Sequence, residues 1–451
     1  MHRQFSARNE DAGFTLIEVV VAMLVFAIIA TGFLMTLTAS MVTTRDTRTR
    51  IVAANLASQQ IDLIRSQSVF DVTNSTRHID LNGDTFHVTV SSSWATASGA
   101  TATCEAGAAT DALAYRQVTV EVTWDNMPAG SRPIFSDTSL APSSKINDPS
   151  RGTILVGVID TAGVGVSGAT VSLSPANGVA AVTTDSDGCA YLLKVPPATS
   201  YTVSVSKTGY VSEQQLTTPT AAVSVTAGVT SRASFAYDKA ATYTLTYANN
   251  VADAVSLPTN LTTTFLSTYG NRQVAATTNA NPKSFSLYPI PSGYSIISGG
   301  YAELSESPSA TCLAPDPSEW TATSTQIGKR PDAVAGAPGS TVTASVPMGV
   351  VKLTGLTGSS GRFITAVYAG GGAGDPGCGY TAKPTYTFSD SAVSSGAATI
   401  ALPYGTWKLY RGTSSGSTST QLTGGIAVAS TGVVSGSGSA TVVTLDPRVA
   451  P

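Results

Sequence analysis

Charged residues are scarce in this chain of 451 residues: Asp, Glu, Lys and Arg make up 12 %, and the formal net charge is −3. So sparse and balanced a charge leaves no electrostatic footprint for nucleic acid or for an anionic membrane surface. Histidine is scarcer still, since the only three are His2, His78 and His87. A Ser-His-Asp or Cys-His catalytic site built within the distal part of the chain is therefore excluded. The chain also lacks an HExxH motif and a Walker-type phosphate loop.

Cysteine is limited to four residues that lie far apart, and no CxxC pair occurs. In an exported protein four such residues predict up to two disulfides, for which three connectivities are possible. We favour Cys312 with Cys378, because both lie in Gly/Pro-rich segments of the distal half. Cys104 with Cys189 is the remaining candidate pair, although Cys189 also suits a small buried residue beside a strand. The sequence predicts no metal ligand set and no cofactor.

The composition favours short strands joined by turns. After residue 66 the chain is dominated by Thr, Ser, Gly, Ala and Val, and the whole chain has 41 Gly and 23 Pro. This mixture suits β-strands and tight turns, whereas a disordered chain would have fewer apolar residues and a larger net charge. The length is too great for one core and predicts about three domains.

One long apolar run stands near the N-terminus. From Phe14 to Leu37, Glu18 is the only charged residue. A helix of this length reaches about 36 Å, which is enough to span a bilayer. A lone carboxylate in such a segment costs about 2.5–3.5 kcal/mol on the insertion scale, so a partner is expected. The segment itself has no Lys, Arg or His, so that partner lies elsewhere.

Three explanations of this run compete. A secretory signal would place its apolar region from Phe14, but a Glu inside that region is unusual and the run is long. An uncleaved membrane anchor leaves Glu18 unpaired. Cleavage after Gly13 would make Phe14 the new N-terminus, and its α-amine could pair with Glu18 of a neighbouring copy shifted along the helix axis. The helix macrodipole also favours a negative charge near the N-terminus.

The stretch G-F-T-L-I-E followed by an apolar run resembles the class III signal of type IV prepilins and pseudopilins. The resemblance implies that a prepilin peptidase cleaves between Gly13 and Phe14 and N-methylates Phe14. It further implies that Glu18 pairs with another pilin subunit's N-terminus during filament assembly. The implied partners are therefore the peptidase, the membrane before assembly, and other pilin or pseudopilin subunits. The implied location is the membrane first, and then an extracellular filament at the cell surface.

Beyond the leader, residues 1–13, we expect a pilin helix over 14–66 with its membrane-spanning part at 14–37. Its second half is half polar, with one polar face and apolar residues on the other sides: Val52, Leu56, Ala57, Leu63 and Ile64. Alternating strands starting near Phe86 and Val118 predict a small β head over residues 67–127 that covers the apolar residues. Four prolines between Met127 and Arg151 predict a linker over 128–150.

Residues 151–238 show short strands separated by turns, which predicts an antiparallel sandwich. The pieces GVIDTAGVGVSGATVSL, TDSDGCAYL and KTGY resemble the carboxypeptidase regulatory-like (transthyretin-like) family, which implies a structural or binding module without catalysis. Ala198 and Thr199 stand where the family has a Gly before the strand tyrosine. Asp185 and Asp187 could bind calcium, but a β-turn with Gly188 at positive φ explains them without metal.

A weak internal repeat follows: VPPATSY, YPIPSGY and LPYGTW each combine a strand end, a Pro turn and an aromatic residue. The intervals between them suit one sandwich each and predict two further β modules, over 239–345 and 346–451. The expected fold class is therefore α+β: a long pilin helix with a small β head, followed by several Ig-like or transthyretin-like sandwich modules.

We expect no enzyme, because the acidic residues Glu303 and Glu306 stand beside Ser and Pro in what is best explained as a loop. The expected function is a minor pilin-like subunit of a type IV filament or secretion pseudopilus. It would display a large β head at or near the tip for adhesion or substrate contact, and its surface ligand is not defined by the sequence. The alternative is a membrane-tethered adhesin that does not enter a filament.

Overall fold

The computed structural model describes residues 15–69, 72–81, 83–96, 101–102, 113–128, 130–141, 150–303, 310–357 and 361–450. Four of the candidate residues lie outside these ranges: Gly13, Phe14, Cys104 and Glu306. Within them the protein is mostly β, with one long N-terminal α-helix followed by many small sheets, as the sequence predicted. The chain divides into two compact units: residues 1–153 with 193–197 and 225–231, and the remainder.

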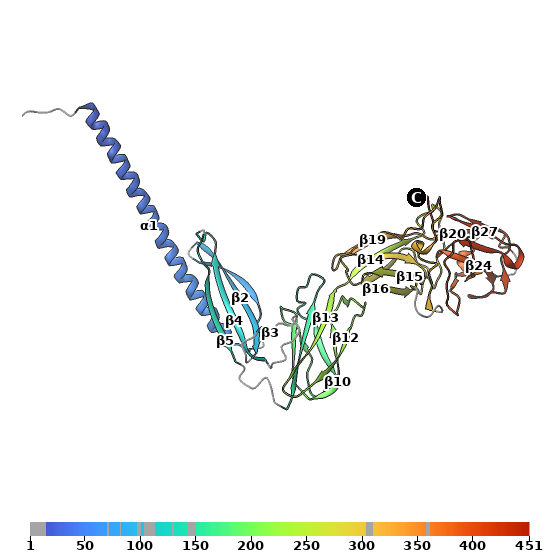
Figure 1. The fold of residues 1–451 in the computed structure, drawn as a ribbon, viewed down its shortest axis with the longest axis horizontal. Coiled ribbons are helices and arrows are strands. Elements are labelled where there is room, and N and C mark those ends of the chain that lie inside the picture. The colour runs from blue at the N-terminus through green and yellow to red at the C-terminus, as the bar shows by residue number, and fades with distance from the viewer. Residues whose placement is uncertain are drawn as a thin grey trace, which may run out of the picture. The chain divides into compact units, whose positions relative to one another are not determined.

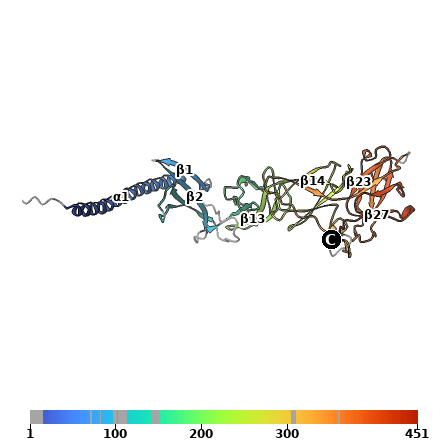
Figure 2. The same cartoon turned by 90° about the horizontal axis from the view of Figure 1, so that it is seen from above.

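The helix α1 runs unbroken from Leu16 to Arg65. Its sequence contains no proline and a single glycine, Gly32, so nothing interrupts the ladder of backbone hydrogen bonds. The first half stands clear of the strands of the head in Figures 1 and 2, and the second half packs on the head. One continuous helix thus provides both an apolar stem and part of a globular core.

The head is a five-stranded sheet in the order β1-β2-β4-β5, with β3 paired to β2. Its strands are β1 Ser75–Leu81, β2 Asp84–Thr96, β3 Thr101–Ala102, β4 Leu113–Trp124 and β5 Ile134–Leu140. Strands β2 and β4 are the two that alternation predicted. Strand β5 lies within 128–150, where the prolines predicted only a linker. Those prolines flank β5 without entering it, and an edge strand tolerates the polar residues that obscured its pattern.

The core of the head forms between one face of α1 and one face of the sheet. The buried helix residues are spaced by three and four: Ala53, Leu56, Ala57, Ile61 and Ile64. They meet alternating side chains of the two central strands, including Val88, Val90, Val120 and Val122. Leu63, which the sequence placed with the apolar residues, is 45 % exposed, because it lies about 100° from Ile64 around the helix. Each Val, Leu or Ile side chain that is fully buried here stabilises the head by about 1.5–3 kcal/mol.

The segment that follows forms a sandwich of two four-stranded sheets, β12-β10-β7-β8 and β11-β13-β6-β9. Its strands are β6 Gly152–Ile159, β7 Thr170–Ser174, β8 Val182–Thr183, β9 Cys189–Val195, β10 Ala198–Ser206, β11 Tyr210–Ser212, β12 Thr220–Val225 and β13 Thr230–Lys239. Tyr201, Val203 and Val205 alternate inward along β10 and are buried. Ala198 and Thr199 begin this strand, so the chain turns there without the family's glycine.

The distal part contains four sheets: β17-β14-β19, β16-β15-β18, β23-β20-β26, and β22-β21-β24-β28-β27 with β25 paired to β24. Their strands are β14 Ala241–Tyr247, β15 Thr262–Ser267, β16 Gly270–Ala275, β17 Lys283–Leu287, β18 Ser295–Ser298, β19 Thr341–Val346, β20 Gly349–Leu353, β21 Phe363–Tyr368, β22 Thr385–Thr387, β23 Ala398–Leu402, β24 Gly405–Gly412, β25 Thr420–Gln421, β26 Ile426–Val428, β27 Gly432–Ser435 and β28 Val442–Leu445.

Residues on both sides of the expected division at 345/346 share one hydrophobic cluster, which runs from Val211 to Leu445. Hydrogen bonds also cross that division: the side-chain amide of Asn250 donates to the carbonyl of Met348 and its carbonyl accepts from the Met348 N–H. The distal part therefore packs around a continuous core.

Candidate functional site

The first half of α1 is an exposed apolar surface. Large side chains from Leu16 to Val42 are 41–83 % exposed, and α1 is the one helix in the described part of the chain that is long and apolar enough to cross a membrane. The hydroxyls of Thr31, Thr36 and Thr38 donate to backbone carbonyls three or four residues earlier. These bonds satisfy the hydroxyls within the helix, as an apolar surrounding requires.

Glu18 lies in the first turn of α1, where the sequence placed it. Thr15 is the N-cap in an extended conformation, and its carbonyl accepts from the N–H of Glu18 at 3.0 Å. The positive end of the helix dipole favours a carboxylate at this position. Glu18 is exposed, so its carboxylate is accessible to a second chain. The predicted cleavage site, Gly13 and Phe14, lies outside the described residues, and cleavage there stays a prediction.

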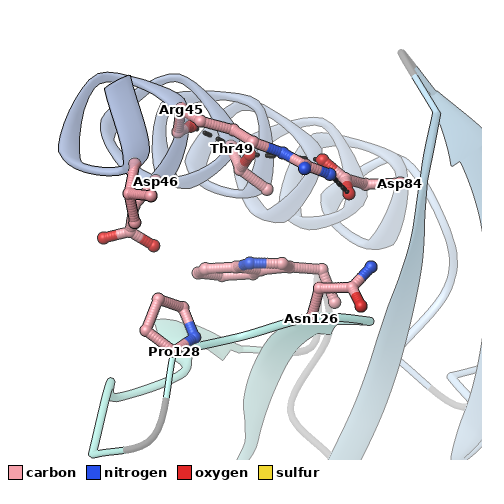
Figure 3. Close-up of a pocket in the computed structure, with 8 residues that line it drawn as sticks. Arg45, Asp46, Thr49, Asp84, Asn126 and Pro128 are labelled. Carbon is pink, nitrogen blue, oxygen red and sulfur yellow. Dashed lines mark hydrogen bonds and ion pairs between the residues drawn. The ribbon is translucent and has the colours of Figure 1, made fainter. Parts of the chain in front are cut away.

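A cavity of about 140 Å³ lies where α1 meets the head (Figure 3). On one side the guanidinium of Arg45 donates to Asp84 at 2.7 Å, and the hydroxyl of Thr49 donates to the same carboxylate at 3.4 Å. Asp84 is the first residue of β2, so this pair ties the N-terminal end of that strand to the helix. Sequence spacing gave no signal for it, since 39 residues separate Arg45 from Asp84.

Asp46 lines the other side of this cavity, which Trp124 and Pro128 also line. Its Oδ1 is buried and has no hydrogen-bond partner among the described residues. A buried carboxylate oxygen without a donor costs about 1–3 kcal/mol relative to one that is satisfied. The junction therefore carries a hydrogen-bonded carboxylate, Asp84, and one oxygen of Asp46 that has no donor among the described residues.

The structure joins Cys312 and Cys378 in a disulfide, across a separation of 66 residues. The two residues are also partners in an isolated antiparallel bridge, and both are buried. Cys189 lies at the start of β9, and its backbone N–H donates to the Oδ1 of Asp185 at 2.9 Å. Its predicted partner Cys104 lies outside the described residues.

The DSDG segment is a turn whose carboxylate is engaged by the backbone. Oδ1 of Asp185 accepts from the N–H groups of Asp187 and Cys189 at 3.0 and 2.9 Å. Gly188 has φ of +73°, and a Cβ there would collide with the carbonyl of Val158. The local geometry is that of the predicted turn with glycine at positive φ.

Comparison with protein families finds two matches. The model described as "Prokaryotic N-terminal methylation motif" matches residues 8–34, which include Gly13, Phe14 and Glu18. The model described as "Carboxypeptidase regulatory-like domain" matches residues 153–238. The chain is thus a type IV prepilin-like protein that carries a carboxypeptidase regulatory-like domain. Its class III signal implies processing by a prepilin peptidase.

No curated protein matches this chain. Among solved structures, "The Bacillus anthracis TIE protein" is 13 % identical, with 77 % of this chain and 70 % of that chain covered and a TM-score of 0.20. "Structure of the Streptococcal ancillary pilin" is 8 % identical, with 51 % and 75 % covered and a TM-score of 0.18. The major pilin subunit of Bacillus cereus, BcpA, is 11 % identical, with 58 % and 87 % covered and a TM-score of 0.16.

Proposed function

We propose that the protein is a minor pilin-like subunit, built through α1 into a type IV filament or secretion pseudopilus. The observation that carries this proposal is Glu18 in the first turn of an exposed apolar helix, inside the matched methylation motif. A carboxylate that costs free energy in an apolar surrounding is best retained where a second chain neutralises it. The α-amine of a processed neighbour, at Phe14, is a cation of the right kind.

The size of the β part supports a rare position in the filament. Only Leu16–Arg65 of the described chain is α-helix, and the head, the sandwich and the distal sheets all follow it. A filament built only from such subunits would have to fit several β domains around each short helical step. We therefore propose a place near the tip or scattered through the shaft, where the β part is displayed outside the cell for adhesion or substrate contact. We further propose that the subunit acts without catalysis.

The test is the variant Glu18→Ala, expressed in cells that assemble the filament. Processing should be unchanged, because the peptidase acts at Gly13, while recovery of the protein in sheared filaments should fall to background. Asp62→Ala is the matched control, since Asp62 is an exposed acidic residue on the same helix outside the apolar half. It should enter filaments at the wild-type level.

N-terminal analysis of the mature protein separates this proposal from the alternative. A chain that begins at N-methylated Phe14 and is found in filaments supports the subunit. An intact Met1 on a protein that is absent from filaments would contradict it and favour the membrane-tethered adhesin. Entry of Glu18→Ala into filaments at the wild-type level would instead show that Glu18 is not the assembly contact, and would remove the observation on which the proposal rests.

A further inference from the structure

The outer face of the head sheet brings two histidines together. His78 of β1 and His87 of β2 are direct partners in the antiparallel register. Their Nδ1 atoms lie 2.7 Å apart, and the two rings meet edge to face with centroids 4.7 Å apart. The chain has three histidines, and the third, His2, lies in the predicted leader. Both histidines beyond the leader thus stand side by side at one spot.

Asp125, just after β4, fixes the second nitrogen of one ring. Its Oδ1 lies 2.8 Å from Nε2 of His87. An ionised carboxylate only accepts hydrogen bonds, so the proton of a neutral His87 is on Nε2. Nδ1 of His87 then presents a lone pair, which accepts from the Nδ1–H of His78. A carboxylate that holds one imidazole nitrogen so that the other presents its lone pair is the arrangement that orients metal-binding histidines.

The surroundings favour a cation and leave the pair accessible. Side chains two residues apart in a strand point to the same face of the sheet. Asp80 is two residues from His78 in β1. Glu121 is two residues from Thr123, which is the β4 partner of His87, so both carboxylates belong to the same outer face as the histidines. The basic side chain of β1, Arg77, contacts Gln60 of α1 instead. The His87 side chain is 31 % exposed. An excess of carboxylates around an accessible pair raises the local concentration of cations.

We propose that His78 and His87 form a binding site for a divalent transition-metal ion that prefers square-planar or tetragonal coordination, Cu²⁺ or Ni²⁺. Two nitrogens at about 2.0 Å from a metal and at right angles are about 2.8 Å apart, whereas tetrahedral ligands are about 3.3 Å apart. The observed 2.7 Å between the Nδ1 atoms is a hydrogen-bond distance, and it lies nearer the first value, so the tetragonal arrangement needs the smaller change in their separation. Asp125 holds the His87 ring in place, and the His78 ring turns about its Cβ–Cγ bond until its Nδ1 lone pair meets the same ion.

The metal ion replaces the proton that lies between the two Nδ1 atoms, and that proton must be accounted for. In the neutral pair the Nδ1 proton of His78 moves to its own Nε2, so the metal enters without net loss of a proton from the pair. A pair that carries an extra proton must release it, so binding weakens as the pH falls. No group of three or more His, Cys, Asp or Glu side chains in the described ranges could hold a metal ion. The site therefore offers two protein ligands, and water fills the other positions.

The test uses the full-length protein in detergent, purified without a polyhistidine tag and in a His2→Gln background. That background is needed because an N-terminal amine next to His2 would itself bind copper. Copper(II) chloride is titrated by calorimetry, and the bound ion is examined by electron paramagnetic resonance. We expect one ion per chain with hyperfine coupling to two imidazole nitrogens, tighter binding of Cu²⁺ and Ni²⁺ than of other divalent ions, and weaker binding at lower pH.

The variants His78→Gln and His87→Gln should each abolish the two-nitrogen signal. Asp125→Asn, which changes only the group that orients His87, should weaken copper binding by about 10- to 100-fold. Thr76→Ala alters the neighbouring cross-strand pair, Thr76 and Thr89, and is the matched control that should bind copper normally. Circular dichroism of each variant checks that the head is folded.

Equal copper binding by the wild-type protein and by a variant that carries both His78→Gln and His87→Gln would assign the ion to other groups and overturn the proposal. So would the absence of binding to a folded wild-type protein, since the pair would then serve only to share a proton. Neither result bears on the proposed filament function, which rests on Glu18 and on the size of the β part and not on this histidine pair.

Discussion

The guanidinium of Arg45 donates to the carboxylate of Asp84 at 2.7 Å, which fastens the middle of α1 to the first residue of β2. The two partners differ in exposure: the side chain of Arg45 is 65 % exposed and that of Asp84 only 9 %. The energetic importance of the pair thus lies with the buried acid, which loses its main donor when Arg45 is removed.

We expect Arg45→Met to destabilise the head by about 1–2 kcal/mol, because Asp84 would then keep only the long bond from Thr49. Asp84→Asn should cost about the same, and the double variant less than the sum. Amide hydrogen exchange of β2 in the solubilised protein measures this loss of stability locally. Thermal or denaturant unfolding of the whole chain would not, because a chain with several domains does not unfold in one two-state transition. Strictly additive single-variant effects would show that the two side chains are not coupled.

Asp46→Ala should stabilise the isolated protein by about 0.5–1 kcal/mol. The substitution removes a buried oxygen that has no donor and improves the helix propensity. The same exchange measurement, applied to amides of α1 near residue 46, detects it. A loss of protection there would mean that the carboxylate has a stabilising partner. Asp62→Ala, at an exposed position of the same helix, controls for propensity alone.

Gly13→Val should block processing, because the added side chain prevents the peptidase from reaching the bond before Phe14. Mass spectrometry of the membrane fraction should find the full-length chain with its leader and no N-methylated Phe14. Recovery of normally shortened protein from this variant would count against the prepilin-type cleavage.

Loss of the Cys312–Cys378 disulfide, by the double variant Cys312→Ala and Cys378→Ala, should destabilise the distal part by about 2–4 kcal/mol. The bond closes a loop of 66 residues and restricts the unfolded chain. Exchange of the β14 and β20 amides, with and without the substitutions, measures the loss. Non-reducing peptide mapping checks the pairing in the wild-type protein, and free thiols at both positions would refute it.

Local patterns in the sequence predicted much of this molecule. The apolar run and Glu18 identified the helix, alternation at Phe86 and Val118 identified the two central strands of the head, and the turn residues outlined the sandwich at 151–238. These features depend on periodicity and turn chemistry, which neighbouring residues determine. Strand β5 was missed because an edge strand needs no apolar alternation.

The contacts that join distant segments could not be predicted in this way. Arg45 meets Asp84 and His87 meets Asp125 only after the sheet has formed, since their register depends on the turns between the strands. Leu63 was assigned to the apolar side because the composition of a helical turn does not say which of its faces meets the sheet. The shared core of the distal part likewise arises from pairings such as that of β14 with β19, far apart in sequence.

The unbroken course of α1 has a mechanical consequence. Its 50 residues form a rod of about 75 Å with no proline hinge, and its last turns, from Ala53 to Ile64, are part of the head core. A tensile force applied to the N-terminal end of α1 is therefore transmitted along the helix to its contact with the sheet. Under load that contact would be sheared along the helix axis, because α1 has no break between its exposed half and the head. The strength of the stem under tension is thus the strength of the head's packing.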